Sequence, residues 1–305
     1  MAIDAIYAAQ WPFFPSICTH LREISRICVQ NIIQSGESRP ALNPPAKGCN
    51  LTDAPTANSG DLTALIESAD SFDRSWSISA EGKAEERFLL FFDRVDGRSQ
   101  KMAALAAQMG MSHTALAQWR LSLSGADAMG LALNAQKSTV RLYSQYWDQL
   151  ASRVAGGNLA PYPVYRGIKS LPDGGMRDDS YLCQPMAPRS EFWPLIETAL
   201  AELGLPKADV AMAFADLDDD NCIFTRTGAA NRQSWLATVR RAQIDKAAWH
   251  RALTALPDTP WAAALRDHAL KHDLLHLAAG RDNSKGEFVS LYFTADAEQL
   301  LAVLR

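Results

Sequence analysis

The sequence has few of the features that identify secreted, membrane-spanning or nucleic-acid-binding proteins. Its 305 residues include five cysteines, an odd number without a Cys-x-x-Cys pair, which argues against a disulfide framework or a zinc ribbon. No apolar run approaches the ~20 residues of a membrane helix. The net charge of −4, from 30 Lys+Arg and 34 Asp+Glu, excludes a strongly basic nucleic-acid-binding surface but allows a local cationic pocket.

These absences predict a cytoplasmic protein that binds neither nucleic acid nor membrane. The first twenty residues carry Asp4 and no basic segment, so we expect no secretory signal. With 48% hydrophobic and 21% charged residues, the composition is that of a globular chain. No Walker loop, G-x-G-x-x-G or G-x-S-x-G motif occurs, which leaves no nucleotide-binding or hydrolase signature.

The composition divides the chain near residue 60. Apolar residues at helical spacing predict an amphipathic helix over 16–34, and the segment after it, rich in Pro, Gly, Ser and Asn, predicts a long irregular connection. We expect residues 1–60 to pack on a second domain, 61–305, which forms a barrel.

From residue 61 onward a unit of strand, turn, strand and helix recurs about five times. In the first copy, SFDRSWSI (71–78) alternates apolar with polar residues and is followed by ERFLLFF (86–92) and a helix over 98–109. The other predicted strand pairs are 118–124 with 137–143, 163–171 with 180–186, 209–215 with 222–226, and 276–280 with 287–294. The other predicted helices are 145–155, 190–203, 230–272 with interruptions at Pro257 and Pro260, and 297–305.

About ten antiparallel strands with a helix after each hairpin predict an α+β fold. We expect a closed antiparallel β-barrel surrounded by helices, because closure removes the sheet edges and the helices cover the outer apolar face. A barrel of this strand number is wide enough to hold a ligand. The hairpin periodicity alone also suits an α+β sandwich.

In a barrel, the polar faces of two strands would direct cations inward. Arg87 alternates with Leu89 and Phe91 on one strand, and Lys137, Thr139 and Arg141 share a face of another. Lys137 and Arg141 would lie about 13 Å apart at ~3.3 Å per residue, a spacing that suits the two ends of a diphosphate. The alternative is that these strands have one solvated face and the cations lie outside.

Several motifs resemble the cyanobactin prenyltransferases, peptide-modifying enzymes with the ABBA barrel. The run ERFLLFFD (86–93) is similar to a family strand whose arginine binds the donor diphosphate, and KSTVR matches the Lys-x-x-x-Arg strand. LYF at 291–293 resembles the final Tyr-bearing strand, and Asp73 stands where the family has a glutamate near the acceptor. The departures are the shorter Asp73 itself and two stretches of small residues, HLAAG (276–280) and VAMAFA (210–215), which favour room for a geranyl as well as a dimethylallyl chain.

The resemblance implies transfer of a dimethylallyl or geranyl group from its diphosphate to a Tyr, Trp, Ser/Thr, His or Arg side chain of a ribosomal, macrocyclic peptide. Asp73 would orient the acceptor and take its proton; a carboxylate there favours a basic acceptor such as guanidinium or imidazole. Arg87, Lys137, Thr139 and Arg141 would bind the diphosphate, assisted by Mg²⁺ for which no protein ligands are assigned. The candidates for the isoprenoid pocket are Phe91, Tyr143, Met212, His276 and Tyr292. We expect a monomer.

Other functions stay open at this point. The same fold would suit a prenyltransferase acting on a small aromatic molecule, or a non-catalytic carrier. Residues 102–120 resemble a helix-turn-helix, which would make the protein a non-enzymatic DNA-binding protein, although the stretch carries few cations. His268, His272 and His276 recur every four residues and would bind a metal if they shared one helical face; a solvated face is the simpler interpretation.

Overall fold

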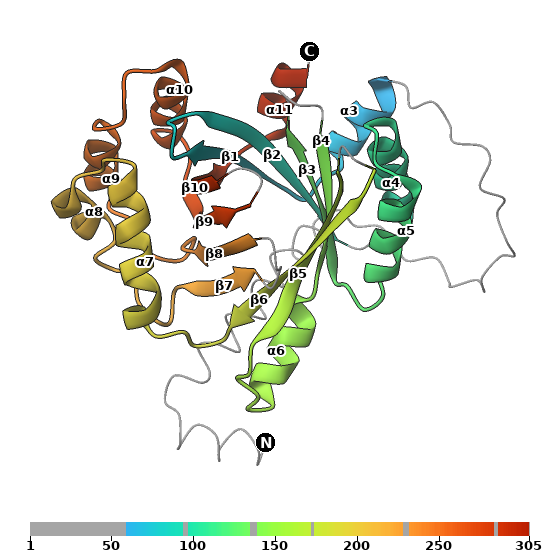
Figure 1. Ribbon diagram of the computed structural model, residues 1–305, viewed down its shortest axis with the longest axis horizontal. Coiled ribbons are helices and arrows are strands. Elements are labelled where there is room, and N and C mark those ends of the chain that lie inside the picture. Colours follow the sequence, from blue (N-terminus) through green and yellow to red (C-terminus); the bar gives the residue numbers. More distant parts are fainter. Residues whose placement is uncertain are drawn as a thin grey trace, which may run out of the picture.

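The computed structural model (Figure 1) describes residues 59–93, 97–134, 139–171, 174–227, 232–283 and 286–304. The predicted helix over 16–34 and its packing on the barrel lie outside the described residues, as does Lys137. Among the described helices, none is long and apolar enough to cross a membrane.

The strands form one closed antiparallel barrel in which each strand pairs with its neighbours in the chain and the last pairs with the first. This confirms the predicted barrel and excludes the sandwich. The strands are β1 (Ser71–Ser79), β2 (Ala84–Asp93), β3 (Ala128–Asn134), β4 (Thr139–Gln145), β5 (Tyr162–Ser170), β6 (Met176–Gln184), β7 (Ile223–Thr227), β8 (Arg232–Thr238), β9 (Leu274–Asp282) and β10 (Gly286–Thr294).

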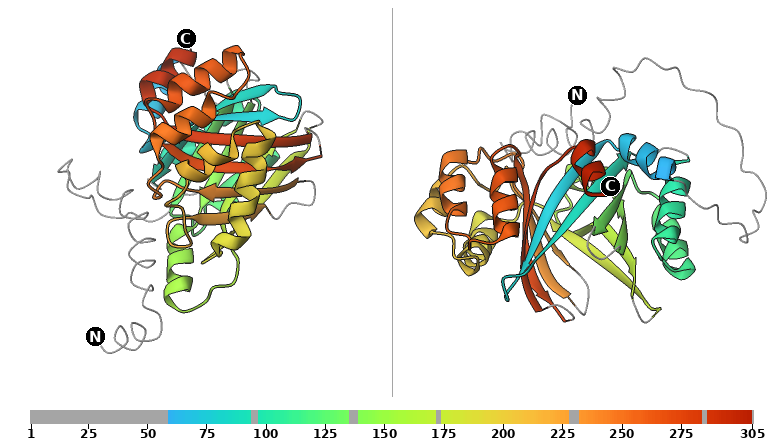
Figure 2. Two further views of the ribbon diagram at one scale, coloured as in Figure 1. Left: turned by 90° about the vertical axis from the view of Figure 1, so that its left-hand side faces the viewer. Right: turned by 90° about the horizontal axis from the view of Figure 1, so that it is seen from above.

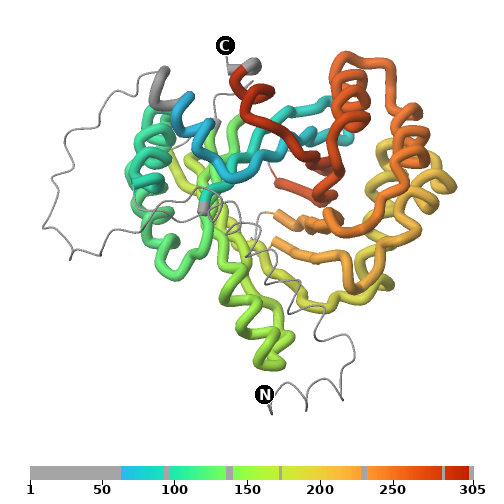
Figure 3. The backbone as a smooth tube through the Cα atoms, turned by 180° about the vertical axis from the view of Figure 1, so that it is seen from behind, coloured from blue at the N-terminus to red at the C-terminus, as the bar shows by residue number. Residues whose placement is uncertain are grey.

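The helices lie around the outside of the barrel (Figure 1). They are α3 (Ser59–Glu67), α4 (Arg98–Gln108), α5 (His113–Ser122), α6 (Trp147–Ala155), α7 (Arg189–Glu202), α8 (Lys207–Ala213), α9 (Lys246–Leu253), α10 (Pro260–Ala269) and α11 (Ala297–Leu304). Figure 2 shows α7–α10 on one side of the barrel and α3–α5 on the other. From behind, α11 lies beside α3, so the last helix of the chain packs against the first described one (Figure 3).

Alternating side chains divide each strand between the outer core and the lumen. On β2, Phe88, Leu90 and Phe92 are fully buried against the helices, whereas Arg87 and Leu89 face inward. One outer cluster joins α7–α10 to β1 and β7–β10, and a second joins α3–α5 and α11 to β2–β5. The helices thus bury the apolar faces of the strands, as the alternation predicts.

One predicted strand, 118–124, is wrong because it is the end of α5. The Ser112 hydroxyl accepts a hydrogen bond from the Ala115 amide and begins this helix. Apolar and polar residues alternate by chance over its last turns: Trp119 is fully buried while Leu121 is 71% exposed. The true strand, β3, is buried on both faces and therefore shows no alternation.

The segment 102–120 does form two helices, but α5 packs against β4, β5 and β6. Trp119 of α5 is fully buried, and its indole nitrogen donates a hydrogen bond to the Tyr143 carbonyl at 3.1 Å. This helix pair is therefore part of the covering of the barrel, not a free DNA-recognition module.

A second predicted strand, 209–215, is wrong because it lies in α8, where Val210 and Ala213 are buried at helical spacing. Met212 was expected to line the isoprenoid pocket, but this is wrong, because its side chain is 52% exposed on the outside of the molecule. The partner of β7 is instead β8, which lies inside the predicted helix 230–272; that region contains β8, α9 and α10.

Trp119→Ala is expected to lower the free energy of unfolding by about 3–5 kcal/mol, because it leaves a large cavity and removes a buried hydrogen bond. Urea denaturation measures the change. Leu121→Ala on the same helix is the control and should change stability by no more than about 0.5 kcal/mol. Equal effects of the two substitutions would contradict the packing of α5.

Candidate active site in the barrel lumen

The lumen contains a cavity of about 720 Å³ between atoms, its open mouth included. Its lining comes from every strand around the barrel except β3, so no single sequence segment contains the site. The opposite, apolar faces of the same strands pack against the helices, and this packing fixes the strands that carry the lumen side chains.

The antiparallel order of the strands gives the lumen two different ends. The five hairpins (β1–β2, β3–β4, β5–β6, β7–β8 and β9–β10) all turn at one rim, here called the hairpin rim, and helical segments join them at the other, the helix rim. Inward residues of an even-numbered strand therefore run from the hairpin rim towards the helix rim. On β4 these are Arg141 and then Tyr143; on β6 they are Arg177, Asp179 and Tyr181.

Four arginines on four strands form a cationic belt near the hairpin rim. Its members are Arg87 on β2, Arg141 on β4, Arg177 on β6 and Arg232 on β8. Three of these side chains, those of Arg87, Arg141 and Arg232, line the cavity. Arg87 and Arg141 therefore both line the cavity inside the barrel, as expected if the polar faces of their strands point inward.

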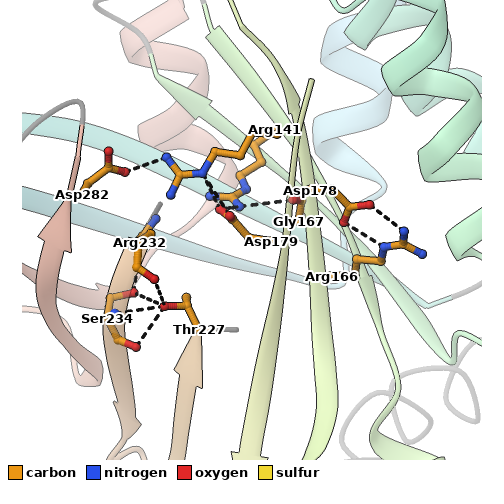
Figure 4. Close-up of polar contacts among 10 residues, drawn as sticks. Arg141, Arg166, Gly167, Asp178, Asp179, Thr227, Arg232, Ser234 and Asp282 are labelled. Atoms are coloured by element: carbon orange, nitrogen blue, oxygen red, sulfur yellow. Dashed lines mark hydrogen bonds and ion pairs between the residues drawn. The ribbon is translucent and has the colours of Figure 1, made fainter. Parts of the chain in front are cut away.

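Two carboxylates pair with the belt (Figure 4). Arg141 donates to the Gly167 carbonyl at 3.2 Å and to the fully buried Asp179 carboxylate. Arg177 donates to Asp179 at 2.9 Å and to Asp282 at 2.7 Å. Burial alone would raise the pKa of Asp179, but the guanidinium groups of Arg141 and Arg177 outweigh it and hold the pKa below its usual value.

Some N–H groups of the belt have no hydrogen-bond acceptor among the described atoms. Arg141 Nε and Arg177 Nη2 are buried without a hydrogen-bond partner. Arg87 Nη2 lies 3.8 Å from Glu85 Oε2, and Arg232 Nε donates to the Ser234 hydroxyl at 2.9 Å. Because buried donors are normally paired, the spare donors favour an anion as the ligand of this end of the cavity.

A glycine makes the position of Arg141 possible. A Cβ atom on Gly167 would lie 2.6 Å from Arg141 Nε and 2.8 Å from the Tyr143 ring, so only glycine lets both side chains lie across β5.

Tyrosines line the lumen on the side of the belt that faces the helix rim. The rings of Tyr143 and Tyr181 lie 6.4 Å apart, and those of Tyr165 and Tyr181 lie 6.2 Å apart. The Arg141 guanidinium carbon is 5.4 Å from the Tyr143 ring, which joins the belt to this aromatic level. Burial raises the pKa of Tyr143 and Tyr165 above the ordinary value, so both phenols are uncharged at neutral pH.

Asp73 and His276 lie beyond the tyrosines, towards the helix rim. His276 Nε2 is 3.7 Å from Asp73 Oδ2, and His276 Nδ1 is 2.8 Å from the Thr238 hydroxyl. Burial raises the pKa of Asp73 to about 7, opposed by the charge of Arg240. Burial lowers the pKa of His276 to about 3, and Arg240 adds to this. A carboxyl that ionises near pH 7 therefore faces a neutral imidazole.

Most predicted site residues do meet in this cavity. Those that line it are Asp73, Arg87, Phe91, Arg141, Tyr143, His276 and Tyr292. Lys137 and the side chain of Thr139 lie outside what the structure describes, so their roles stay predictions. Met212 is the exception, as its helix lies outside the barrel.

Three inward residues of β6 were not predicted as site residues: Arg177, Asp179 and Tyr181. The predicted strand started at residue 180, four residues after the observed start, which assigned two of them to the turn. Their i, i+2, i+4 spacing was the available signal. Arg232 was missed because its region was predicted to be helical. Tyr165 was missed because no motif in its predicted strand indicated a functional role.

The described residues do not fit a protein-bound metal. They contain no cluster of three or more His, Cys, Asp or Glu side chains that could hold one, and the carboxylates of Asp179 and Asp282 are occupied by arginines. His268 and His272 stack at 4.0 Å outside the lumen, whereas His276 points into it, so the three histidines do not share a face.

Gly167→Ala is expected to weaken the binding of inorganic diphosphate about tenfold, because the new Cβ displaces Arg141 and one charged hydrogen bond is lost. Isothermal titration calorimetry measures the affinity. Gly156→Ala, at the end of α6, is the matched control and should bind as the wild type does. An unchanged affinity in Gly167→Ala would remove Arg141 from the anion site.

The raised pKa of Asp73 also predicts a pH-dependent stability. The folded state holds this proton more tightly than the unfolded chain, so the stabilisation is complete below about pH 4 and is lost as the pH rises through about 7. Relative to Asp73→Asn, the wild type should lose up to about 4 kcal/mol over this interval in urea denaturation. Parallel curves for the two proteins would show that Asp73 is not desolvated.

No family model matches the sequence, and no curated protein is significantly similar to it. Solved structures with partial structural similarity include 5-dimethylallyltryptophan synthase from Streptomyces coelicolor, at 14% identity over 75% of this chain and 82% of that chain, with a TM-score of 0.43. NotF in complex with brevianamide F and DMSPP shares 11% identity over 74% of this chain and 80% of that chain, with a TM-score of 0.45. The comparisons do not show membership of the cyanobactin prenyltransferases.

Proposed function

We propose that the protein transfers an isoprenyl group from its diphosphate to a nucleophilic atom of an acceptor held beside Asp73. The observation that carries this proposal is the order of groups in one cavity. Guanidinium groups with spare donors lie near one rim, tyrosines follow, and a carboxyl with a pKa of about 7 lies beyond them. This order matches a leaving diphosphate, an allylic cation and an acceptor that loses a proton.

The cationic belt would bind the diphosphate and stabilise its departure. As the bond between the allylic carbon and oxygen breaks, negative charge grows on the diphosphate, where Arg87, Arg141 and Arg232 line the cavity. Asp179 and Asp282 hold Arg141 and Arg177 in position before the donor arrives. Such preorganised charge needs no rearrangement during the reaction and is the largest catalytic contribution available here.

The aromatic level would stabilise the allylic cation. Tyr143 and Tyr181 present π faces close to the belt, and Leu89 and Leu236 add apolar walls. Aromatic faces attract a cation, and an apolar lining keeps away the water that would capture it. Ala278 also lines the cavity, which leaves space for a longer chain; the small residues of α8 do not contribute, since they lie outside.

Asp73 would complete the transfer as general base. The acceptor atom forms a bond to the allylic carbon, its proton passes to the Asp73 carboxylate, and diphosphate is released. A base with a pKa of about 7 is matched to this task at neutral pH, because it is ionised yet retains affinity for the proton.

We favour a small aromatic molecule as acceptor. Asp73 is 5% exposed and lies beyond the tyrosines, so the reacting group must enter the lumen completely. Tyr165 and Tyr292 offer ring surfaces for a planar molecule at that level. A ribosomal macrocyclic peptide, implied by the motif resemblance, is the second candidate, since one extended side chain would reach the same carboxyl.

The test is incubation with dimethylallyl or geranyl diphosphate and a panel of aromatic metabolites and cyclic peptides, read by mass spectrometry. We expect addition of one isoprenyl unit to an aromatic metabolite, and a loss of about 10²-fold or more in Asp73→Asn, which cannot accept the proton. Parallel reactions with Mg²⁺ and with EDTA test whether Mg²⁺ assists the transfer.

Arg141→Gln should lower turnover at least tenfold, whereas Arg251→Gln should not change it. Arg251 is a suitable control because it also pairs with an aspartate, Asp209, but on the outer surface. Absence of any isoprenyl adduct across the panel, or turnover that survives Asp73→Asn, would refute the proposed function. Modification of cyclic peptides alone would select the second acceptor class.

A further inference from the structure

Three strands bring Asp73, His276 and Thr238 together near the helix rim. Asp73 comes from β1, Thr238 from β8 and His276 from β9. His276 Nδ1 lies 2.8 Å from the Thr238 hydroxyl, while Nε2 faces Asp73 Oδ2 at 3.7 Å. None of the three belongs to the cationic belt, and the proposed function uses only Asp73.

The surroundings favour one tautomer of His276. A hydroxyl can donate or accept, so Thr238 is compatible with either form, but the Asp73 carboxylate opposite Nε2 favours a proton on Nε2. The Thr238 hydroxyl then donates to the lone pair of Nδ1. Each of the two ring nitrogens thereby faces a complementary partner.

Few other charges act on this pair. Tyr165 faces it from β5 and Tyr292 from β10, where the Tyr292 ring lies 5.8 Å from the imidazole. The exposed Arg240, just after β8, is the cation that affects both groups. Asp73 is the only carboxylate among the described residues that line the cavity.

We infer that His276 is a positioning residue for the proton transfer. Its Nε2 faces Asp73 Oδ2 at 3.7 Å, just beyond hydrogen-bond distance, and we expect its proton to be donated to that oxygen once the acceptor is bound and the carboxyl is ionised, which directs the other oxygen at the acceptor. Thr238 holds the imidazole in the required tautomer. This inference rests on the proposed function and narrows the acceptor. Since the imidazole presents a donor, one carboxylate oxygen remains for the acceptor, which suits a single neutral N–H or O–H and not a guanidinium group.

The first test follows the titration of Asp73 directly, by ¹³C NMR of protein labelled at aspartate, with Asp73→Asn for assignment. His276→Phe removes a donor to the ionised carboxyl and should raise the midpoint by about one pH unit, whereas His276→Gln, whose amide nitrogen replaces Nε2, should not. His276→Asn places its nitrogen nearer to Nδ1 and should resemble the Phe variant. An unchanged midpoint in His276→Phe would overturn the inference. This measurement needs no turnover, so it is independent of the proposed function.

The tautomer is measured by long-range ¹H–¹⁵N NMR of histidine-labelled protein at pH 7. We expect a neutral ring with its proton on Nε2 in the wild type and in Thr238→Ser, and a mixture in Thr238→Val. A proton on Nδ1 in the wild type would overturn the inference.

Where an acceptor is modified, the kinetic parameters give a third test. His276→Phe should lower kcat at pH 7 about tenfold and shift the acidic limb of the pH profile upward, with the donor KM unchanged within twofold. His276→Gln should restore most of the rate. A change confined to the donor KM would show that His276 lines the isoprenoid pocket instead.

Discussion

A guanidinium group inside a closed barrel needs a partner, and this requirement organises the lumen. Isolated charge is costly to bury, so the carboxylates of Asp179 and Asp282 accompany the arginines of the belt. The pairing is incomplete, because Arg141 Nε and Arg177 Nη2 have no acceptor among the described atoms. The carboxylates therefore fix the arginines in place, and the spare donors favour the proposed binding of a further anion. Gly167 contributes by leaving room for Arg141.

The two buried aspartates show how position along the barrel decides chemistry. Asp179 lies between two guanidinium groups, which hold its pKa below the ordinary value in spite of burial. Asp73 lies at the other end of the lumen without such a partner in contact, so desolvation dominates and its pKa rises to about 7. The first aspartate is suited to a structural ion pair and the second to proton transfer. The tyrosines between them separate the charge of the belt from Asp73.

The errors of the sequence analysis have physical causes. Residues 118–124 alternate like a strand, but Ser112 caps a helix there and Trp119 is buried by tertiary contacts with β4–β6. β3 was not recognised, because a strand buried on both faces has no alternation. The strand predicted at 209–215 is helical, since its small apolar residues suit either structure and its packing against α9 decides between them. Local pattern carries no information on such contacts.

The sequence alone determined the hairpin-and-helix repeat, because alternation and turn residues act locally and recur. A closed barrel and a sandwich both fitted this repeat, and the pairing of β1 with β10 decided for the barrel. Period-two alternation also assigned Asp73, Arg87 and Arg141 to the polar faces of their strands, but only the closure of the barrel decided that these faces line a cavity. Only the tertiary structure decided which groups meet: the register across ten strands brings Arg177 and Asp179 to Arg141, and His276 to Asp73. The pKa values likewise depend on burial and on charges from other strands, which no stretch of sequence contains.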